Sequence, residues 1–298
     1  MDIYKSLVSI ENVCIGLGFF DGVHLGHKAL IKELVDLSKS SGLKSVILTF
    51  KESPAKIFTE SVNYISTTEE RESMFRALGV DVVVELDFNE DLANLSADDY
   101  LKEIVFANFK PKYVFSGFNH TFGKNKIGNS KFLDDNQSKY MYIYKEIPPV
   151  KCGNDIISST LIKKYISEGN VEKANLMLGY DFKIEGIVIE GNKLGRTIGF
   201  PTANINYPAG KVEIPYGVYS STVMVDGVNY NAILNYGKKP TISLNNVNPV
   251  AEVHILGFNN DIYGQKIEVC IQKMIRSEIK FESIENLKQQ IIRDIELC

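Results

Sequence analysis

The first 180 residues alternate short apolar runs with longer stretches in which apolar residues recur every three or four positions. Runs of the first kind predict strands, and stretches of the second kind predict helices. The expected strands are Val13–Leu17, Ser45–Phe50, Asp81–Leu86, Tyr113–Ser116 and Met141–Lys145. The expected helices are Lys28–Ser40, Thr68–Leu78, Ala97–Asn108, Ser130–Ser138, Ser159–Ser167 and Val171–Leu178. This alternation predicts a parallel sheet with helices on both faces and ligand sites at the carboxyl ends of its strands.

The pattern changes after Tyr180, where short strands are separated by turn signals such as Asp226-Gly227. The expected strands are Lys183–Glu190, Val218–Val225, Val228–Leu234, Val250–Phe258 and Gln265–Ile275. They predict a small antiparallel barrel. A final amphipathic helix is expected over Ser283–Leu297, beginning at a serine cap. We therefore expect two domains, 1–181 and 182–298.

Composition narrows the classes of protein. A chain of 298 residues with 44% hydrophobic content can bury a large core, and its length favours two domains. A net charge of −4 gives no global basic field for nucleic acid or anionic membranes. No apolar stretch approaches the roughly 20 residues that span a bilayer, and the N-terminus lacks a signal-peptide pattern. The four cysteines are scattered, so we expect free thiols in the cytoplasm.

The segment Gly18–His27 reads G-F-F-D-G-V-H-L-G-H and joins the first expected strand to the first expected helix. A glycine-rich turn that opens a helix presents free N–H groups and the positive end of the helix dipole, and phosphate binds there. Two imidazoles, His24 and His27, reach the same pocket, and Gly26 lets a nucleotide approach the backbone closely. This arrangement suits nucleotidyl transfer, in which stabilising charge around phosphorus is most of the work.

Two other interpretations of these histidines are weaker. A zinc site needs three or four ligands, whereas only His120 and His254 remain, with no paired cysteines and no H-E-x-x-H motif. Two solvated turn histidines would leave Asp21-Gly22 and the flanking strand and helix unexplained. Phosphate chemistry is therefore favoured.

The second half carries its own motif, Gly195–Asn204, which reads G-R-T-I-G-F-P-T-A-N. Pro201 restricts the backbone, and Thr202 and Asn204 point to one side if they lie on a strand. A hydroxyl and an amide oxygen so placed suit a Mg²⁺–ATP complex. A glycine-rich hairpin with a polar rim is the alternative.

Both halves resemble one family, the prokaryotic bifunctional riboflavin kinase/FMN adenylyltransferases, in order and over essentially the whole chain. In the first half, the similar motifs are Gly18–His27, Leu95–Ala97, Gly117–Gly123 and Ile157–Lys163. In the second half, they are Gly195–Asn204, Pro215–Tyr219, Asn235–Thr241, Glu252–Phe258, Asp261–Gly264 and Arg276–Glu278. The resemblance implies an α/β Rossmann-like nucleotidyltransferase domain with a parallel sheet, followed by an antiparallel β-barrel riboflavin kinase domain with a C-terminal helix.

The resemblance implies two successive reactions. The barrel would transfer the γ-phosphate of ATP to riboflavin, giving FMN, and the first domain would join FMN to the AMP part of a second ATP with release of pyrophosphate. The implied partners are riboflavin, FMN and ATP with Mg²⁺, without nucleic acid or membrane. The expected assembly is a monomer or weak homo-oligomer.

The resemblance also implies residue roles. Catalytic roles fall to Glu252, as general base for riboflavin, and to His24 and His27 at the ATP phosphates. The implied ATP or phosphate contacts are Gly18, Phe20, Asp21, Gly22, Gly26, Asn119, Ser158, Ser159, Thr160, Lys163, Gly195, Arg196, Thr202 and Asn204, the last two also holding Mg²⁺. The implied flavin contacts are Phe50, Phe118, Tyr219, Arg276 and Glu278. Taken alone, Ser159 is equally well explained as a helix cap.

The chain departs from the family pattern at three positions. Ser53 stands where the family usually has histidine, Lys163 where it has arginine, and Gly257 where it has aspartate. Lysine keeps the charge of arginine but loses the bidentate fork. Two alternatives follow: a kinase alone with a weak or inactive first domain, or a flavin-sensing binding protein. The presence of His24, His27 and Glu252 together argues against a pure binding module.

Overall fold

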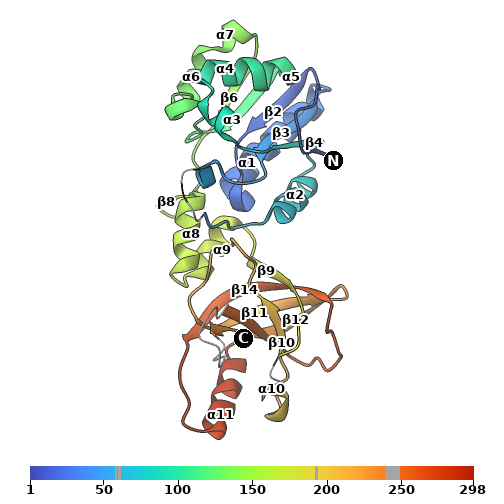
Figure 1. The fold of residues 1–298 in the computed structure, drawn as a ribbon, viewed down its shortest axis with the longest axis vertical. Helices are drawn as coiled ribbons and strands as arrows, with labels where there is room; N and C mark the ends of the chain where they lie inside the picture. The colour runs from blue at the N-terminus through green and yellow to red at the C-terminus, as the bar shows by residue number, and fades with distance from the viewer. Residues whose placement is uncertain (58, 60–61, 192–193, 239–248) are drawn as a thin grey trace. The chain divides into compact units, whose positions relative to one another are not determined.

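The computed structural model describes residues 1–57, 59, 62–191, 194–238 and 249–298. These form two compact units, Met1–Ser159 and Thr160–Cys298 (Figure 1). Within the described residues, no helix is long and apolar enough to cross a membrane.

The first unit is built on a six-stranded parallel sheet, as the alternation predicts. Its strands are β1 (Asp2–Tyr4), β2 (Val13–Leu17), β3 (Lys44–Phe50), β4 (Val82–Leu86), β5 (Tyr113–Gly117) and β6 (Ile143–Ile147). The spatial order is β1-β4-β3-β2-β5-β6. The chain proceeds outward from β2 through β3 and β4, and then continues on the other side of β2 with β5 and β6. Ligands bind beyond the carboxyl ends of the strands at such a reversal, and Gly18–His27 begins there.

Helical segments cover both faces of this sheet. They are α1 (Leu25–Ser40), α2 (Thr68–Ala77), α3 (Glu90–Asn94), α4 (Ala97–Asp99), the π-helical η3 (Tyr100–Phe106), α5 (Ala107–Phe109), α6 (Ser130–Asp135) and α7 (Gln137–Tyr140), with short 3₁₀ turns η1 (Asp21–Val23), η2 (Pro54–Ile57) and η4 (Lys124–Lys126). Leu34 of α1 and Phe75 of α2 pack with Ile47 on one face. Leu101 of η3 and Phe109 of α5 pack on the other. The small ribbon β7 (Lys151–Cys152) and β8 (Asp155–Ile156) follows.

The second unit contains the expected antiparallel barrel. Its strands are β9 (Phe182–Ile187), β10 (Ala203–Asn206), β11 (Gly217–Val225), β12 (Val228–Lys238), β13 (Pro249–Ile255) and β14 (Lys266–Ser277). They pair in the order β10-β13-β12-β11-β14-β9. A bridge between Ile189 and Asn204, with the Ile189 N–H 2.8 Å from the Asn204 carbonyl oxygen, joins the two outer segments. The helices of this unit are α8 (Ser159–Ser167), α9 (Val171–Leu178), α10 (Leu194–Thr197) and α11 (Ile284–Ile295).

The division between the units falls at Ser159/Thr160, earlier than the expected boundary at 181/182. The reason is the packing of α9 on the barrel. The Asn175 side chain donates a hydrogen bond to the Ile271 carbonyl and accepts one from the Phe182 N–H, at 2.9 and 2.8 Å. Helix α9 therefore groups with the strands that follow it.

Several boundaries differ from the sequence expectation for local reasons. Helix α1 begins at Leu25 rather than Lys28, because the His24 side chain caps it. The expected strand Met141–Lys145 is shifted to Ile143–Ile147, because Met141 adopts a left-handed conformation that ends α7. The expected helix Ala97–Asn108 consists of α4, the π-helical segment η3 and α5. The short strands β1, β7, β8 and β10 are not among the expected strands.

Candidate functional site

The turn after β2 is sharply folded. Phe20, Gly22 and Val23 all have positive φ, at 58°, 77° and 35°. Position 22 requires glycine for two reasons: its φ is 77°, and a Cβ there would lie 2.9 Å from Cγ2 of Ile65. Glycine is the residue that adopts this conformation without steric cost. The backbone conformation of this turn therefore restricts the path by which the chain enters the first turn of α1.

The two motif histidines lie face to face at the start of α1. Their ring centroids are 3.6 Å apart with planes 15° from parallel. The His24 Nδ1 atom accepts the His27 N–H at 3.3 Å, which caps the helix. Gly26 makes room for this ring, because a Cβ there would lie 3.2 Å from Nδ1 of His24.

Both imidazoles are held in the neutral form. Burial lowers the pKa of His24 to about 4. Burial holds the pKa of His27 well below its usual value, and a positive charge on this ring would also be repelled by a protonated His24 and by Arg71. Because Nδ1 of neutral His24 accepts a hydrogen bond, its proton lies on Nε2. His24 can therefore donate from Nε2 to a phosphate oxygen without carrying a charge itself.

Asp21 organises the segments around this turn. Its Oδ1 atom accepts from the Ile65 and Ser66 N–H groups, at 2.9 and 3.3 Å. The hydroxyl of Ser159 donates to the Asp21 carbonyl oxygen at 3.0 Å. The carboxylate is buried, so the expected phosphate contact at this position would come through the backbone.

Arg71 of α2 is a buried residue at this site that sequence reasoning missed. Its guanidinium donates to the carbonyl oxygens of Phe19, Phe50 and Lys51, at 2.7, 2.9 and 3.1 Å, and lies 4.5 Å from the centroid of the Phe19 ring. It thereby ties together the ends of the neighbouring strands β2 and β3. The available signal was its position four residues before buried Phe75, on the same face of an amphipathic helix.

The other expected residues of the first half are more scattered. Gly18 follows β2, and Phe118 and Asn119 follow β5 with exposed side chains. Phe50, at the end of β3, packs edge-to-face on Phe88.

Ser158 immediately precedes α8, whereas Thr160 and Lys163 lie on α8 in the second unit. Ser53, at the first departure from the family pattern, accepts the Ala55 N–H at 3.3 Å.

In the barrel, three polar residues lie side by side on adjacent strands. The register pairs Asn204 of β10 with Glu252 of β13, and Glu252 with Asn235 of β12. Directly opposed residues project from the same face of a sheet. All three line a cavity of about 510 Å³, together with Thr202, Gly195 and the side chains of α11 that face the barrel. Asn235 was not among the expected site residues.

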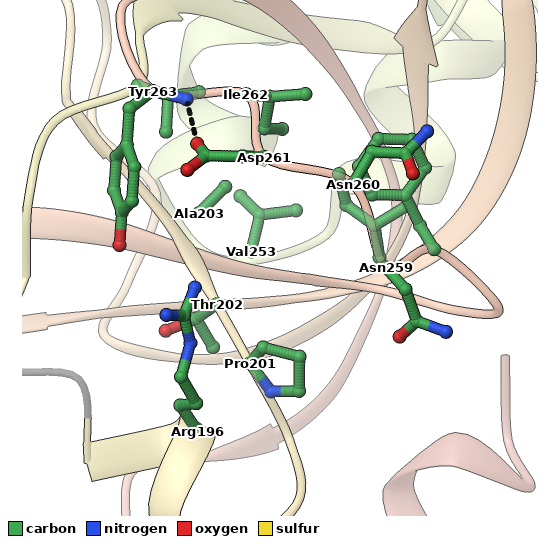
Figure 2. Close-up of a pocket in the computed structure, with 13 residues that line it drawn as sticks. Arg196, Pro201, Thr202, Ala203, Val253, Asn259, Asn260, Asp261, Ile262 and Tyr263 are labelled. Atoms are coloured by element: carbon green, nitrogen blue, oxygen red, sulfur yellow. Dashed lines mark hydrogen bonds between the residues drawn. The ribbon is translucent and has the colours of Figure 1, made fainter.

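A second cavity of about 470 Å³ adjoins the segment 195–202 that also lines the first cavity. Figure 2 shows Arg196 and Thr202 along one side and Asp261 and Tyr263 along another. The Asp261 carboxylate accepts the Tyr263 N–H at 3.0 Å, which shapes the loop. Thr202 lines both cavities, so it lies where they meet.

The expected flavin contacts in the barrel divide into two groups. Arg276 and Glu278 line the larger cavity. Arg276 is fixed by Asp294 of α11, with Nε and Nη2 3.1 and 2.8 Å from the carboxylate oxygens. Tyr219 does not line it: its ring is fully buried in the core and its hydroxyl donates to the Pro215 carbonyl oxygen. In the expected motif Asn235–Thr241, residues 239–241 lie outside the described residues.

The side chains of Thr202 and Asn204 fit a magnesium ion. The Asn204 Oδ1 atom is buried and has no hydrogen-bond partner in the described part of the protein. An unsatisfied buried acceptor costs roughly 1–3 kcal/mol. Amide and hydroxyl oxygens such as those of Asn204 and Thr202 are hard ligands of the kind Mg²⁺ takes, alongside phosphate oxygens.

Comparison with known proteins places both halves in characterised families. A family model for FAD synthetase matches residues 8–161, and one for riboflavin kinase matches residues 178–298. Proteins named bifunctional riboflavin kinase/FMN adenylyltransferase are similar throughout. The one from Bacillus subtilis is 35% identical over 94% of this chain and 89% of its own length. The one from Escherichia coli is 32% identical over 95% and 91%.

A solved structure agrees with the fold. A crystal structure described as a macrolide-efflux protein from Streptococcus pneumoniae superimposes with a TM-score of 0.90 at 31% identity, over 100% of this chain and 98% of the other. The two family models and the similar bifunctional enzymes confirm the expected family and both expected activities. The chain belongs to the bifunctional riboflavin kinase/FMN adenylyltransferases, which phosphorylate riboflavin to FMN and adenylylate FMN to FAD.

Proposed function

We propose that riboflavin phosphorylation takes place where the two barrel cavities meet. Riboflavin occupies the larger cavity, between Glu252 and α11, and ATP enters the smaller one beside Arg196 and Tyr263. Thr202 and Asn204 hold the phosphates and Mg²⁺ between them. The observation that carries this proposal is that Thr202 lines both cavities while Glu252 lies opposite Asn204 in the strand register.

The phosphoryl transfer then needs one base. Glu252 accepts the proton of the ribityl 5′-hydroxyl as that oxygen forms its bond to the γ-phosphorus, and the bond from that phosphorus to the β,γ-bridging oxygen breaks to release ADP. Bound Mg²⁺ supplies neutralisation of the phosphate charge. Arg276, held by Asp294, and Glu278 orient the flavin from the wall of the cavity.

For adenylyl transfer, we propose that the triphosphate lies at the N-terminus of α1. An oxygen of the FMN phosphate attacks the α-phosphorus of ATP, and pyrophosphate leaves. The nucleophile brings its own negative oxygen, so no general base is needed. Neutral His24 and His27 donate hydrogen bonds to phosphate oxygens, and these bonds strengthen as charge develops in the transition state. Asn119, Ser158 and Ser159 complete the phosphate contacts within the first unit, and Phe50 and Phe118 contact the flavin.

The kinase assignment is tested with Glu252→Gln, which keeps the size of the side chain and removes the base. We expect the rate of FMN formation from riboflavin to fall about 10²–10⁴-fold, the usual contribution of a general base. FAD formation from supplied FMN is the control, and we expect it to be unchanged. Kinase activity within threefold of the wild type would reject Glu252 as the base.

We also propose that the protein works in the cytoplasm, as a monomer or weak homo-oligomer. All four cysteines are free, in keeping with a reducing compartment. Light scattering coupled to size-exclusion chromatography tests the assembly.

A further inference from the structure

His254 lies next to the kinase site and has no role in the reaction as described above. It follows Glu252 by two residues on β13, so both side chains project from the same face. Both residues line the larger cavity. The His254 Nδ1 atom is 2.8 Å from the carbonyl oxygen of Pro201, and its ring packs edge-to-face on Phe200 with centroids 5.6 Å apart.

The chemistry of this contact fixes the proton on the imidazole. A carbonyl oxygen can only accept a hydrogen bond, so Nδ1 must carry the hydrogen. Nε2 is then an acceptor in the neutral ring.

The hydrogen bond from His254 to the Pro201 carbonyl lies where the backbone pairing of β10 and β13 ends. Backbone pairing between β10 and β13 begins at Ala203, opposite Val253. Pro201 has no N–H group with which to continue the ladder. The His254 side chain takes over beyond that point and holds the Pro201 carbonyl. Thr202, between Pro201 and Ala203, is thus held from both sides where the two cavities meet.

We infer that His254 is a positioning residue of the kinase, whose Nδ1–H bond to the Pro201 carbonyl fixes Thr202 against the transferred phosphate. The inference rests on the proposed role of Thr202. Holding the phosphoryl group in line with the riboflavin hydroxyl is the main task of such a site, and a misplacement of about 1 Å can cost about 10²-fold in rate. His254 itself takes no proton from the substrate, which distinguishes it from Glu252.

Two substitutions in the full chain separate the bond from the bulk of the ring. His254→Asn keeps a donor on the atom bonded to Cγ, where Nδ1 lies, and can still reach Pro201. His254→Gln moves the amide one bond further, toward the position of Nε2. We expect the kinase kcat of H254Q to fall by about tenfold or more, with riboflavin binding, measured by quenching of flavin fluorescence, within about twofold of the wild type. We expect H254N to retain kcat within about threefold.

Equal losses in H254N and H254Q, or full kcat in H254Q, would overturn the inference. If H254Q fails to bind riboflavin, His254→Phe takes its place, since it keeps a ring against Phe200 and lacks the donor; full kcat in H254F would equally overturn it. Thr202→Val checks the underlying assignment separately. Unchanged kinase kinetics in T202V would reject the proposed role of Thr202, whatever the His254 variants show.

Discussion

At the scale of single residues, the neutral histidines of the first unit make its stability depend on pH. His24 and His120 both have pKa values lowered by burial from 6.5 to about 4. Between these values the unfolded chain binds protons that the folded protein does not. The free energy of unfolding must therefore decrease as the pH falls from about 6.5 to about 4, by up to about 3 kcal/mol for each group.

His24→Asn tests this dependence without removing the helix cap, because the asparagine side chain can accept the same N–H. We expect the urea midpoint of the wild type to fall more steeply between pH 7 and pH 4.5 than that of the variant. Parallel curves for the two proteins would show that His24 is not held neutral by the fold.

Gly22 offers a second prediction at this scale, with a matched control in the same unit. Gly22→Ala has to adopt φ 77° and place a Cβ 2.9 Å from Ile65, whereas Gly42→Ala has to adopt φ 66° with no atom within 4 Å of its Cβ. We expect G42A to lose about 1 kcal/mol of unfolding free energy, and G22A to lose roughly 1–3 kcal/mol more. Only G22A should also lose FAD formation from FMN, with FMN formation from riboflavin intact. Equal effects of the two substitutions on stability and on FAD formation would contradict this account of the turn.

At the scale of secondary-structure elements, Arg71 joins the ends of β2 and β3 through α2. Arg71→Met would remove the guanidinium from three backbone carbonyls. The Phe19 and Lys51 carbonyls keep the hydroxyls of Thr49 and Thr68 as donors, whereas the Phe50 carbonyl loses its guanidinium donor, at a cost of about 1–3 kcal/mol if it stays buried. We expect the rate of FAD formation to fall by at least about tenfold, because a displacement of catalytic groups by about 1 Å can lower a rate by about 10²-fold. We expect kinase activity to stay unchanged. Arg76→Met, at an exposed position of the same helix, is the control and should stay within about twofold. Matching losses in the two variants would show that Arg71 has no special role.

The ion pair between Arg276 and Asp294 fixes α11 at the wall of the larger cavity. Asp294→Asn removes the charge that holds the Arg276 guanidinium, and loss of a charged hydrogen bond costs about 1.5–3 kcal/mol. We expect the KM for riboflavin to rise about tenfold, with the KM for ATP and FAD formation unchanged. Arg293→Gln, at the exposed neighbouring position of α11, serves as the control. An unaltered KM for riboflavin in D294N would separate α11 from flavin binding.

The elements themselves were largely predictable, and their exceptions have physical causes. Periodicity located β2 to β5 and most of the barrel strands, because strands with a buried face carry apolar residues. The expected range of β6 was two residues early, and this strand is mostly exposed or half-buried. Periodicity missed β1, β7, β8 and β10, which have three, two, two and four residues, too few to show a period. It placed the start of α1 three residues late, because a histidine is an unusual cap.

The residues themselves predicted the candidate site only where they lie close in the sequence. Glu252, Arg276 and Glu278 were expected through the family resemblance, and they line the same cavity as Asn204. His24 with His27, and Thr202 with Asn204, are local pairs and were predicted from their motifs. Asn235, Arg71 and Asp294 reach their partners through strand register or helix packing, which the sequence does not show. Tyr219 stands in a motif but is enclosed by the barrel core, because a strand residue projects to the side that its register dictates.

At the scale of the whole molecule, one chain carries two chemistries in its two halves. We propose that the kinase depends on Glu252 and the junction of two barrel cavities, and that the adenylyltransferase depends on the histidine turn at the end of β2. Each activity therefore serves as the folding control for variants of the other. FMN is the product of the first reaction and the substrate of the second.

The most direct test supplies riboflavin, excess ATP and Mg²⁺ to the wild type, to Glu252→Gln and to His27→Asn, and separates the flavins over time. We predict that the wild type forms FMN and then FAD, and that H27N accumulates FMN. E252Q should leave riboflavin unchanged yet convert supplied FMN to FAD. Loss of both activities from either single substitution, in a protein that remains folded, would contradict the assignment of the two reactions to separate sites.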